Sequence, residues 1–228
     1  MAQQTVNAST ASPSRRGRWL FWPGVILVVA GLALLGYVAW QLWGTNYVSQ
    51  QRQEQAVTEI SEAWQQGDSV VATDWGEAEA IIRIPRFGDD YAIPVFEGTG
   101  DEVLSAGYGH FADTAEPGQI GNYALAAHRV THGEPLRDMP ELDVGDQVIV
   151  ETRQTTYTYE LVSGGDDLIV DFHDIWVTDP LPTNPEGGVQ PPQKKNQRLL
   201  TLTTCSELFH TDNRMIAFAT LVDTARRS

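Results

Sequence analysis

The sequence contains a single cysteine, Cys205, in 228 residues. One cysteine cannot form an intrachain disulfide, so the fold has to be stable without one. A lone thiol is also more often a packed, inert side chain than a reactive one. Any chemical role for Cys205 must therefore be supported by the residues around it.

Basic residues are scarce in this chain. It has 15 Lys and Arg against 30 Asp and Glu, a formal net charge of −15. Arg15, Arg16 and Arg18 lie in the first 43 residues, which contain no acidic residue, so 12 basic and 30 acidic residues remain for the rest. Such a domain lacks the basic surface that binds nucleic acid phosphates, and we expect no nucleic acid partner.

Charge is absent altogether between Trp19 and Trp43. This apolar run is long enough to cross a hydrocarbon core of about 30 Å as a helix. Tryptophans stand at both ends, where indole rings favour the headgroup region. A cleaved signal peptide is the competing interpretation, but the run is longer than a usual signal core and ends in aromatic rather than small residues. We expect one transmembrane helix over residues 19–43.

The flanks of this run differ in character. Residues 1–18 are polar and end in Arg-Arg-Gly-Arg, and we expect a disordered cytoplasmic tail. The arginines precede the span, so the positive-inside rule places the N-terminus in the cytoplasm and the bulk of the chain outside. Residues 44–79 are polar and rich in Gln and Glu, with sparse apolar positions, which predicts a helical stalk followed by a linker.

Long helical patterns are lacking from residue 80 to residue 224. Short β-branched and aromatic runs are separated by turn residues, with space for a short helix between Thr99 and Phe111. About eight such runs are present, at residues 80–88, 91–98, 122–128, 147–152, 156–162, 168–172, 198–205 and 214–222. This pattern predicts an all-β domain, an eight-stranded closed β-barrel with short helices.

Cys205 ends one of these runs, in the segment Thr-Leu-Thr-Thr-Cys, and Arg214 begins the next. The polar loop between them holds Asp212 and Asn213, which favour turns, so we expect an antiparallel hairpin. Antiparallel pairing places the last residue of the first strand beside the first residue of the second. A neighbouring guanidinium favours a thiolate, which makes Cys205 a candidate nucleophile and Arg214 a candidate stabiliser of an oxyanion.

A cysteine nucleophile needs a partner that takes and returns a proton, and the chain has five histidines. His132, His173 and His210 fall in predicted loops, and His110 falls in a glycine-rich turn. His128 ends the apolar run Asn-Tyr-Ala-Leu-Ala-Ala-His, where a buried strand would hold it rigidly. Spacing alone does not choose among them, since any one of the five is more often structural than catalytic.

Four segments together resemble the sortase family. They are GYGHF, EPGQIGNYALAAHRVTHG, LDVGDQVIVET and LTLTTC followed by NRMIAFATLV, in that order, within residues 80–224. The combination of TLTTC, a downstream arginine and an upstream ALAAHR is specific. The N-terminal anchor, the acidic domain and the GHF and PGQIGN segments most resemble class E, the housekeeping type of many actinobacteria.

The resemblance implies an eight-stranded sortase barrel and a site of Cys205, His128 and Arg214. In that site the cysteine is the nucleophile, the histidine the general acid and base, and the arginine the stabiliser of oxyanion or substrate. The implied substrate is a secreted protein with a sorting signal of the form Leu-Ala-X-Thr-Gly or Leu-Pro-X-Thr-Gly. It is cleaved between Thr and Gly and transferred to an amine of a cell-wall precursor or a pilin. No metal or cofactor is implied.

The same resemblance suggests residues that contact the substrate. His110 and Phe111 precede the strand of the catalytic histidine, and class E members often carry Tyr where this chain has Phe111. Thr203 and Thr204 stand beside the nucleophile and are placed to offer a hydroxyl or an amide, although filling a β-strand explains them equally well.

Other kinds of protein remain open at this point. An L,D-transpeptidase carries its cysteine in a Ser-His-Gly-Cys segment, which this sequence lacks, and a papain-like peptidase has Cys before His. A membrane-tethered binding module that keeps a barrel without activity is a third alternative, against which the presence of all three site residues counts.

Overall fold

The computed structural model describes residues 15–40, 44–206 and 212–227. The chain consists of two compact units, and the boundary between them lies after Gln41. The first unit contains helix α1 (Arg15–Ala39). Residues 15–18, expected in the disordered tail, are helical here, because nothing separates the arginines from the apolar run and each added residue extends the helix by one hydrogen bond. The expected tail up to residue 14 and the expected end of the span at residues 41–43 lie outside the described residues.

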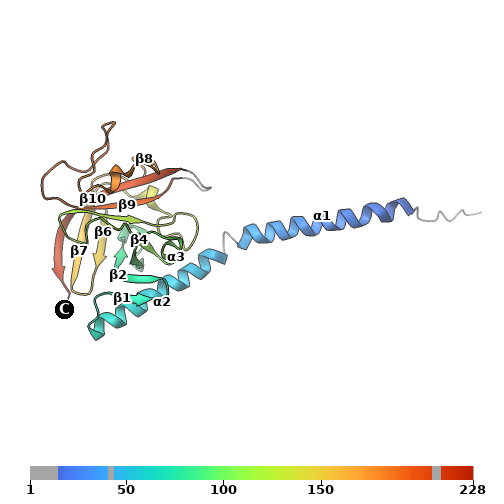
Figure 1. Ribbon diagram of the computed structural model, residues 1–228, viewed down its shortest axis with the longest axis horizontal. Coiled ribbons are helices and arrows are strands. Elements are labelled where there is room, and N and C mark those ends of the chain that lie inside the picture. The colour runs from blue at the N-terminus through green and yellow to red at the C-terminus, as the bar shows by residue number, and fades with distance from the viewer. Residues whose placement is uncertain (1–14, 41–43, 207–211, 228) are drawn as a thin grey trace, which may run out of the picture. The chain divides into compact units, whose positions relative to one another are not determined.

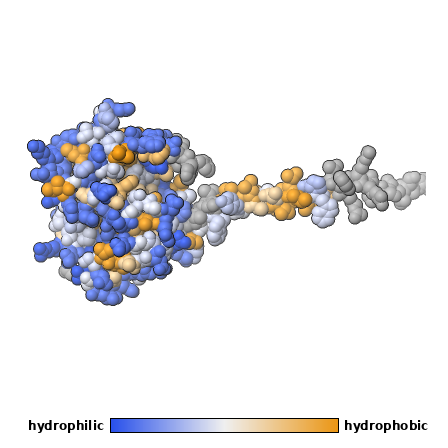
Figure 2. Space-filling model, in the orientation of Figure 1, coloured by the Kyte–Doolittle hydropathy of each residue, from blue (hydrophilic) through white to orange (hydrophobic). Residues whose placement is uncertain are grey.

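Helix α1 is apolar enough to cross a membrane from Phe21 to Ala39, with a mean hydropathy of 2.1. Figure 2 shows its apolar side chains in orange, whereas the visible face of the second unit is mainly hydrophilic. Both a membrane anchor and a signal sequence have these properties.

The second unit is built on a closed β-barrel. Eight strands form a ring in the order β2-β3-β4-β5-β9-β10-β7-β6, and pairing of Ile82 in β2 with Val150 in β6 closes it. Two neighbouring pairs, β3 with β4 and β5 with β9, are parallel, and the others are antiparallel. Strands β1 and β8 lie outside the ring, on β2 and on β10. The expected eight-stranded barrel is therefore confirmed (Figure 1).

The elements of this unit follow a simple order along the chain. The ring strands are β2 (Gly76–Arg83), β3 (Ile93–Glu97), β4 (Tyr108–His110), β5 (Gly121–Ala126), β6 (Gln147–Glu151), β7 (Thr155–Leu161), β9 (Arg198–Cys205) and β10 (Asn213–Arg226). The additional strands are β1 (Val71–Thr73) and β8 (Leu168–Asp171). The helices are α2 (Thr45–Gln66), α3 (Asp101–Leu104) and the 3₁₀ turns η2 (Pro85–Phe87), η3 (Met139–Glu141) and η4 (Ile175–Thr178).

Alternating side chains explain the barrel core, because successive residues of a strand point to opposite faces. Inward positions are large and apolar, and they include Ile82, Val95, Leu125, Leu202 and Ala217. A smaller cluster covers the outer face of β10, where Ile216 and Phe218 pack against Val177 of η4. The barrel thus has a filled interior and an outer face that η4 partly covers.

Helix α2 differs from the stalk expected over residues 44–66. Its residues Ala56, Ile60 and Trp64, each four positions apart, are buried against the outer face of β2 and β3. Ala78 and Ile81 of β2 and Phe96 of β3 supply the other side of this contact. Figure 1 shows α2 beside β1 and β2. One apolar residue per helical turn is thus enough to hold α2 on the outer face of the barrel sheet, whose inner face is covered by the barrel core.

The linker expected over residues 67–79 is also different in the structure. Gly67 ends α2 with a left-handed φ of 111° and donates its N–H to the carbonyls of Ala63 and Trp64. The chain then enters β1 at Val71 and β2 at Gly76. Of the acidic residues that resembled a linker, Glu77 is an exposed position of β2 and Glu79 is a mostly buried one, so the domain begins before residue 80.

Truncation of Ile60 distinguishes a packed helix from a free stalk. Ile60 is 0% exposed, so we expect Ile60→Ala to lower the free energy of unfolding by about 2–4 kcal/mol. Gln65→Ala, at an exposed position of the same helix, should change it by less than about 0.5 kcal/mol. Denaturant titration of the full chain measures both, and equal stability of the two variants would contradict the packing described.

Candidate active site

Strands β9 and β10 bring Cys205 and Arg214 together. The register of the hairpin pairs these two residues directly across the antiparallel ladder. The predicted pairing of the last residue of one strand with the first of the next is therefore confirmed. The loop that joins them is described only at its ends, and His210 lies outside the described residues.

Strand β5 places His128 on the other side of Cys205. β5 and β9 run parallel with Ala126 opposite Thr203, so two residues further along each chain His128 comes level with Cys205. The pairing continues past the end of β5, since the Ala127 N–H donates to the Thr203 carbonyl at 3.2 Å. A second contact fixes the same step, because the Thr204 hydroxyl donates to the Ala127 carbonyl at 2.7 Å.

All three residues belong to the outer face of the barrel. The inward positions of these strands include Leu125 and Ala127 of β5, Leu200 and Leu202 of β9, and Met215 and Ala217 of β10. His128, Cys205 and Arg214 are each an odd number of positions from those residues, so their side chains alternate to the outside. A thiol, an imidazole and a guanidinium therefore share one face at one edge of the sheet.

The imidazole of His128 is half-buried against a second histidine. Its ring stacks on that of His132, with ring centroids 4.6 Å apart and an angle of 28° between the planes. Burial, followed by the nearby charge of His132, lowers the pKa of His128 to about 4, against a smaller opposing effect of Asp101. His128 is therefore a neutral imidazole at neutral pH, able to accept a proton.

Arg214 is oriented by contacts at the start of β10. Its Nη1 donates to the carbonyl of Asn213 at 3.0 Å, and its Cζ lies 5.9 Å from the centre of the Phe172 ring. The guanidinium keeps its positive charge throughout the working pH range. Cys205 beside it is a half-buried free thiol.

The two threonines next to Cys205 differ in their availability. Thr203 is 7% exposed and shares the outer face with Cys205, two positions away. Thr204 is 3% exposed, and its hydroxyl is engaged by the Ala127 carbonyl. The Thr204 hydroxyl joins the strands of Cys205 and His128, so the expected substrate contact of Thr204 stays a prediction that its backbone amide could still meet. Thr203 remains a candidate.

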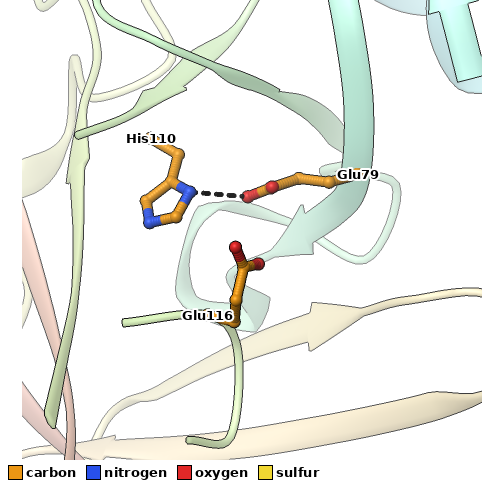
Figure 3. Close-up of side chains that lie close together, drawn as sticks. All are labelled: Glu79, His110 and Glu116. Atoms are coloured by element: carbon orange, nitrogen blue, oxygen red, sulfur yellow. Dashed lines mark ion pairs between the residues drawn. The ribbon is translucent and has the colours of Figure 1, made fainter. Parts of the chain in front are cut away.

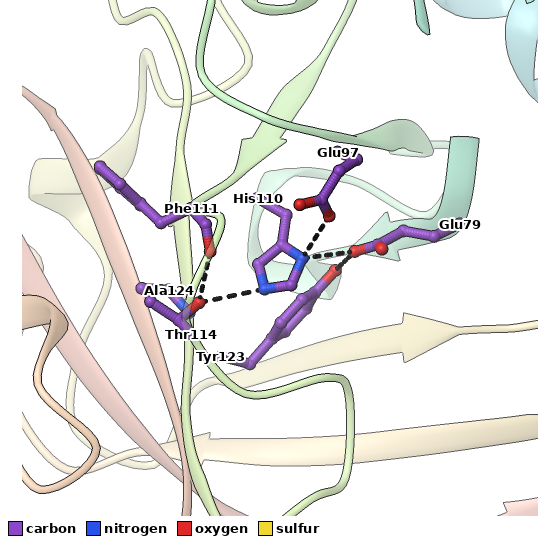
Figure 4. Close-up of polar contacts among 7 residues, drawn as sticks. All are labelled: Glu79, Glu97, His110, Phe111, Thr114, Tyr123 and Ala124. Atoms are coloured by element: carbon purple, nitrogen blue, oxygen red, sulfur yellow. Dashed lines mark hydrogen bonds and ion pairs between the residues drawn. The ribbon is translucent and has the colours of Figure 1, made fainter. Parts of the chain in front are cut away.

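His110 and Phe111 lie on opposite sides of the sheet. Figure 4 shows the Phe111 side chain directed away from His110. His110 pairs with Leu125, an inward position, and its ring is 2% exposed and 4.7 Å from that of Tyr123. The structure therefore places His110 on the inward side, away from the face of Cys205, and its expected contact with substrate has no support from this position. Phe111 is half-buried on the outer side and stays a candidate.

The surroundings of His110 show why it is buried. Its Nδ1 faces two carboxylates, Glu79 at 3.2 Å and Glu97 at 3.1 Å, and its Nε2 lies 3.0 Å from the Thr114 hydroxyl. That hydroxyl donates its own proton to the Phe111 carbonyl, so it accepts from Nε2 (Figure 4). This arrangement favours protons on both ring nitrogens, and so the imidazolium form of His110.

Electrostatics agree with this assignment. Burial by itself lowers the pKa of His110, but the hydrogen bond and charge of Glu79 and the charges of Glu97 and Glu116 outweigh it and raise the pKa above its ordinary value. Burial and then the charge of Glu79 raise the pKa of Glu116. His110 is a buried counterion for neighbouring acids.

Glu79, His110 and Glu116 are also the residues whose arrangement most suggests a metal ligand set in the described part of the chain. Their ligand atoms lie within 4.8 Å of one another, beside a cavity of about 440 Å³ (Figure 3). A metal here would have to displace the proton that His110 directs at the carboxylates. The imidazolium supplies the charge that a cation would bring, so the geometry alone does not assign a metal.

Sequence reasoning missed two features near the site. Glu79 was placed in a linker, so its bond to His110 had no visible signal in the sequence. The stack of His132 on His128 depends on a turn that contacts helix α2, a contact that the sequence does not reveal, although the short spacing of the two histidines was visible.

Comparisons with known proteins agree with the fold. The model of the sortase domain family matches residues 82–222. Sortase SrtE1 of Streptomyces coelicolor is 33% identical over 213 residues, which are 90% of this chain and 58% of that protein. The chain thus spans less than two thirds of the length of that relative.

Solved structures give the same grouping. Sortase E from Streptomyces avermitilis has 40% identity and a TM-score of 0.56, over 64% of this chain and 89% of that one. Sortase E1 from Streptomyces coelicolor with a tripeptide in the active site has 32% identity and a TM-score of 0.54, over 65% and 90%.

The environment of His128 predicts a pH dependence of stability. Its pKa is about 4 in the folded chain and about 6.5 in the unfolded chain, so between these values only the unfolded state binds the proton. The contribution of His128 to stability is therefore present above about pH 6.5 and is lost as the pH falls toward 4. As the pH falls over this range, we expect the wild type to lose stability relative to His128→Gln, which has no imidazole to protonate. Denaturant titration of both proteins at each pH measures this change. A difference that is constant with pH would contradict the lowered pKa.

Proposed function

The chain belongs to the sortase family, and from the geometry of its site we propose that it is a membrane-anchored cysteine transpeptidase acting on C-terminal sorting signals. The observation that carries the proposal is the meeting of three strand ends, which aligns His128, Cys205 and Arg214 on one outer face. In the proposed reaction the enzyme cleaves a Thr–Gly peptide bond and transfers the threonine carboxyl to an amine.

The first half of the reaction forms a thioester. The neutral imidazole of His128 accepts the proton of the Cys205 thiol, and the thiolate attacks the threonine carbonyl carbon. The carbonyl electrons move to oxygen, where the Arg214 guanidinium stabilises the negative charge. As the tetrahedral intermediate collapses, the C–N bond breaks and His128 gives its proton to the leaving glycine amine.

The second half repeats these steps with an amine in place of the thiol. A neutral primary amine attacks the thioester carbonyl, His128 removes the amine proton, and the C–S bond breaks to release the Cys205 thiolate, which takes the proton back. The acceptor we propose is an amine of a cell-wall precursor or a pilin lysine. No step requires a metal or a redox cofactor.

The proposed signal is Leu-Ala-X-Thr-Gly in preference to Leu-Pro-X-Thr-Gly. Support comes from the identity to class E sortases. Phe111 lacks the hydroxyl of the Tyr that class E members often carry there, so the proposed preference is a modest one. Alanine keeps a backbone N–H that proline lacks, and an acceptor at that subsite would gain a hydrogen bond from it.

The proposed location is the cell membrane, with the N-terminus in the cytoplasm and the barrel outside. The apolar segment of α1 supports the span. Arg15, Arg16 and Arg18 on its N-terminal side support the orientation, because positive charge is retained on the cytoplasmic side. This location would give the barrel access to secreted proteins and to wall amines.

Active-site variants test the reaction. We expect Cys205→Ala and His128→Ala to abolish cleavage of a fluorogenic sorting peptide by the full chain in detergent micelles. Arg214→Lys should lower kcat/KM by about 100-fold, since an ammonium does not reproduce the planar fork of a guanidinium. Gln65→Ala, on an exposed surface, is the matched control.

Two outcomes would change the proposal. Cleavage by Cys205→Ala would exclude the thiol mechanism. Failure of the wild-type chain to cleave any sorting peptide, with or without an added amine, would favour a binding module that keeps the barrel without the activity.

The choice between alanine and proline is measured with two peptides that differ only at that position. One extra hydrogen bond is worth about 0.5–1.5 kcal/mol, so we expect kcat/KM to favour alanine by a factor of about 2–10. Phe111→Tyr restores the hydroxyl usual in class E and should increase this preference. A faster proline peptide would reject the proposed specificity and leave the reaction itself intact.

A further inference from the structure

We infer that helix α2 is a positioning element for His128, and that it acts through the turn at residues 131–134 and the ring of His132. This inference rests on the proposed function, because it assigns the helix a part in the same reaction. It departs from the role of a stalk that the sequence of α2 suggests.

The first step in the inference is the contact between α2 and the turn. Asn46 makes two hydrogen bonds there: its Nδ2 donates to Glu134 Oε1 at 2.6 Å, and its Oδ1 accepts from the Gly133 N–H at 3.1 Å. Gln53, two turns further along the helix, donates from Nε2 to the His132 carbonyl at 3.3 Å. Gln53 is 3% exposed. Two side chains of α2 thus hold three consecutive residues of the turn.

The second step is the conformation of those residues. His132, Gly133 and Glu134 have φ values of 55°, 80° and 53°, all in the left-handed region. His132 and Glu134 are not glycines, and a residue with a side chain rarely adopts this backbone conformation unless its surroundings impose it. At Gly133 an added Cβ would lie 2.5 Å from Gln53 Nε2. The bonds from Asn46 and Gln53 help to stabilise this unusual turn, together with the bond from the Glu134 N–H to the Thr131 carbonyl at 3.2 Å within the turn itself.

The third step connects the turn to the site. The left-handed turn places the His132 ring flat against His128, and the Thr131 hydroxyl lies 3.0 Å from His132 Nδ1. The His128 carbonyl accepts from the Leu136 N–H at 3.0 Å, which closes the loop on itself. His132 thereby covers one face of the His128 imidazole and fixes the plane in which that ring lies.

Charges on neighbouring elements act on the same pair of rings. Burial and then the charge of Arg52 in α2 lower the pKa of His132, and Asp101 in α3 opposes this effect. The charge of His132 in turn lowers the pKa of His128, where Asp101 again opposes it. Helix α2 therefore acts on the turn both through hydrogen bonds and through Arg52.

A general acid and base loses effectiveness rapidly when its ring is displaced, since a shift of about 1 Å can reduce the rate about 100-fold. Loss of the contacts from α2 should therefore lower kcat more than it raises KM. His132 and the two α2 residues are positioning residues in this scheme, because they touch His128 or its turn and not the substrate.

The test uses the full chain in micelles and a sorting peptide that the wild type cleaves. We expect His132→Ala, Asn46→Ala and Gln53→Ala each to lower kcat by about tenfold or more, with KM changed less than about twofold. His132→Phe keeps a flat ring in the stack and should restore most of the lost kcat. Ile60→Ala, which weakens the packing of α2 away from the turn, should lower stability with kcat unchanged under conditions where it stays folded.

A second readout does not depend on turnover. NMR titration of isotope-labelled histidine should show the pKa of His128 rising from about 4 toward its ordinary value in His132→Ala, because the ring loses both its cover and the neighbouring charge. An unchanged kcat and an unchanged His128 titration in His132→Ala would overturn the inference. The inference would also be overturned if Ile60→Ala and Asn46→Ala both lost kcat in proportion to their loss of stability, because the effect would then be a general one of destabilisation.

The two proposals fail in distinguishable ways. If the wild type cleaves no peptide, the proposed function fails, while the titration still tests the positioning of His128. If the wild type is active and the turn variants match it, the positioning role alone is rejected.

Discussion

The register between β5, β9 and β10 is the constraint on which the site depends. A parallel pair and an antiparallel pair share the central strand β9, so the end of β5, the end of β9 and the start of β10 meet at one edge of the sheet. Because side chains alternate, a shift of one residue in either pairing would turn one of the three groups into the barrel. The bond from the Thr204 hydroxyl to the Ala127 carbonyl secures the parallel pairing at the point where it matters most.

The barrel protects this register from both sides. Inward residues such as Leu125 and Leu202 are 0% exposed, so slippage of a strand would place polar residues in the core. On the outer face, Thr201 donates to Asn122 Oδ1 at 2.8 Å, and Asn122 donates to the Val177 carbonyl of η4 at 3.0 Å. These buried polar groups have satisfied hydrogen bonds only in the observed pairing, which makes the alternative registers costly.

A low pKa for His128 bears on how the proposed reaction starts. With a value of about 4, the imidazolium form of His128 is a minor species at neutral pH. The neutral ring can therefore take a proton from Cys205 in the first step of the proposed reaction.

The sequence was sufficient to predict the barrel and the pairing of Cys205 with Arg214. Both depend on local patterns, namely apolar alternation and a single hairpin. His128 was selected through family resemblance, because its position beside Cys205 depends on a parallel pairing between segments far apart in the chain. Its catalytic role, with that of Cys205 and Arg214, remains a prediction.

The differences from expectation have physical causes as well. His110 was expected near the substrate because it precedes the strand of His128, whereas alternation along β4 turns it inward to Glu79 and Glu97. Helix α2 was expected as a stalk because it carries few apolar residues. Its burial depends on β2, a strand with apolar side chains on both faces, which a pattern of single-sided alternation does not reveal.

The docking of α2 also determines where this protein can be divided. A version cut at Gly67, which the stalk interpretation would recommend, would leave Ile81 and Phe96 uncovered on the outside of the barrel. An exposed apolar surface of this kind promotes aggregation. A fragment that lacks the apolar segment of α1 keeps this face of the barrel covered only if it retains α2, so its first residue should lie before Thr45.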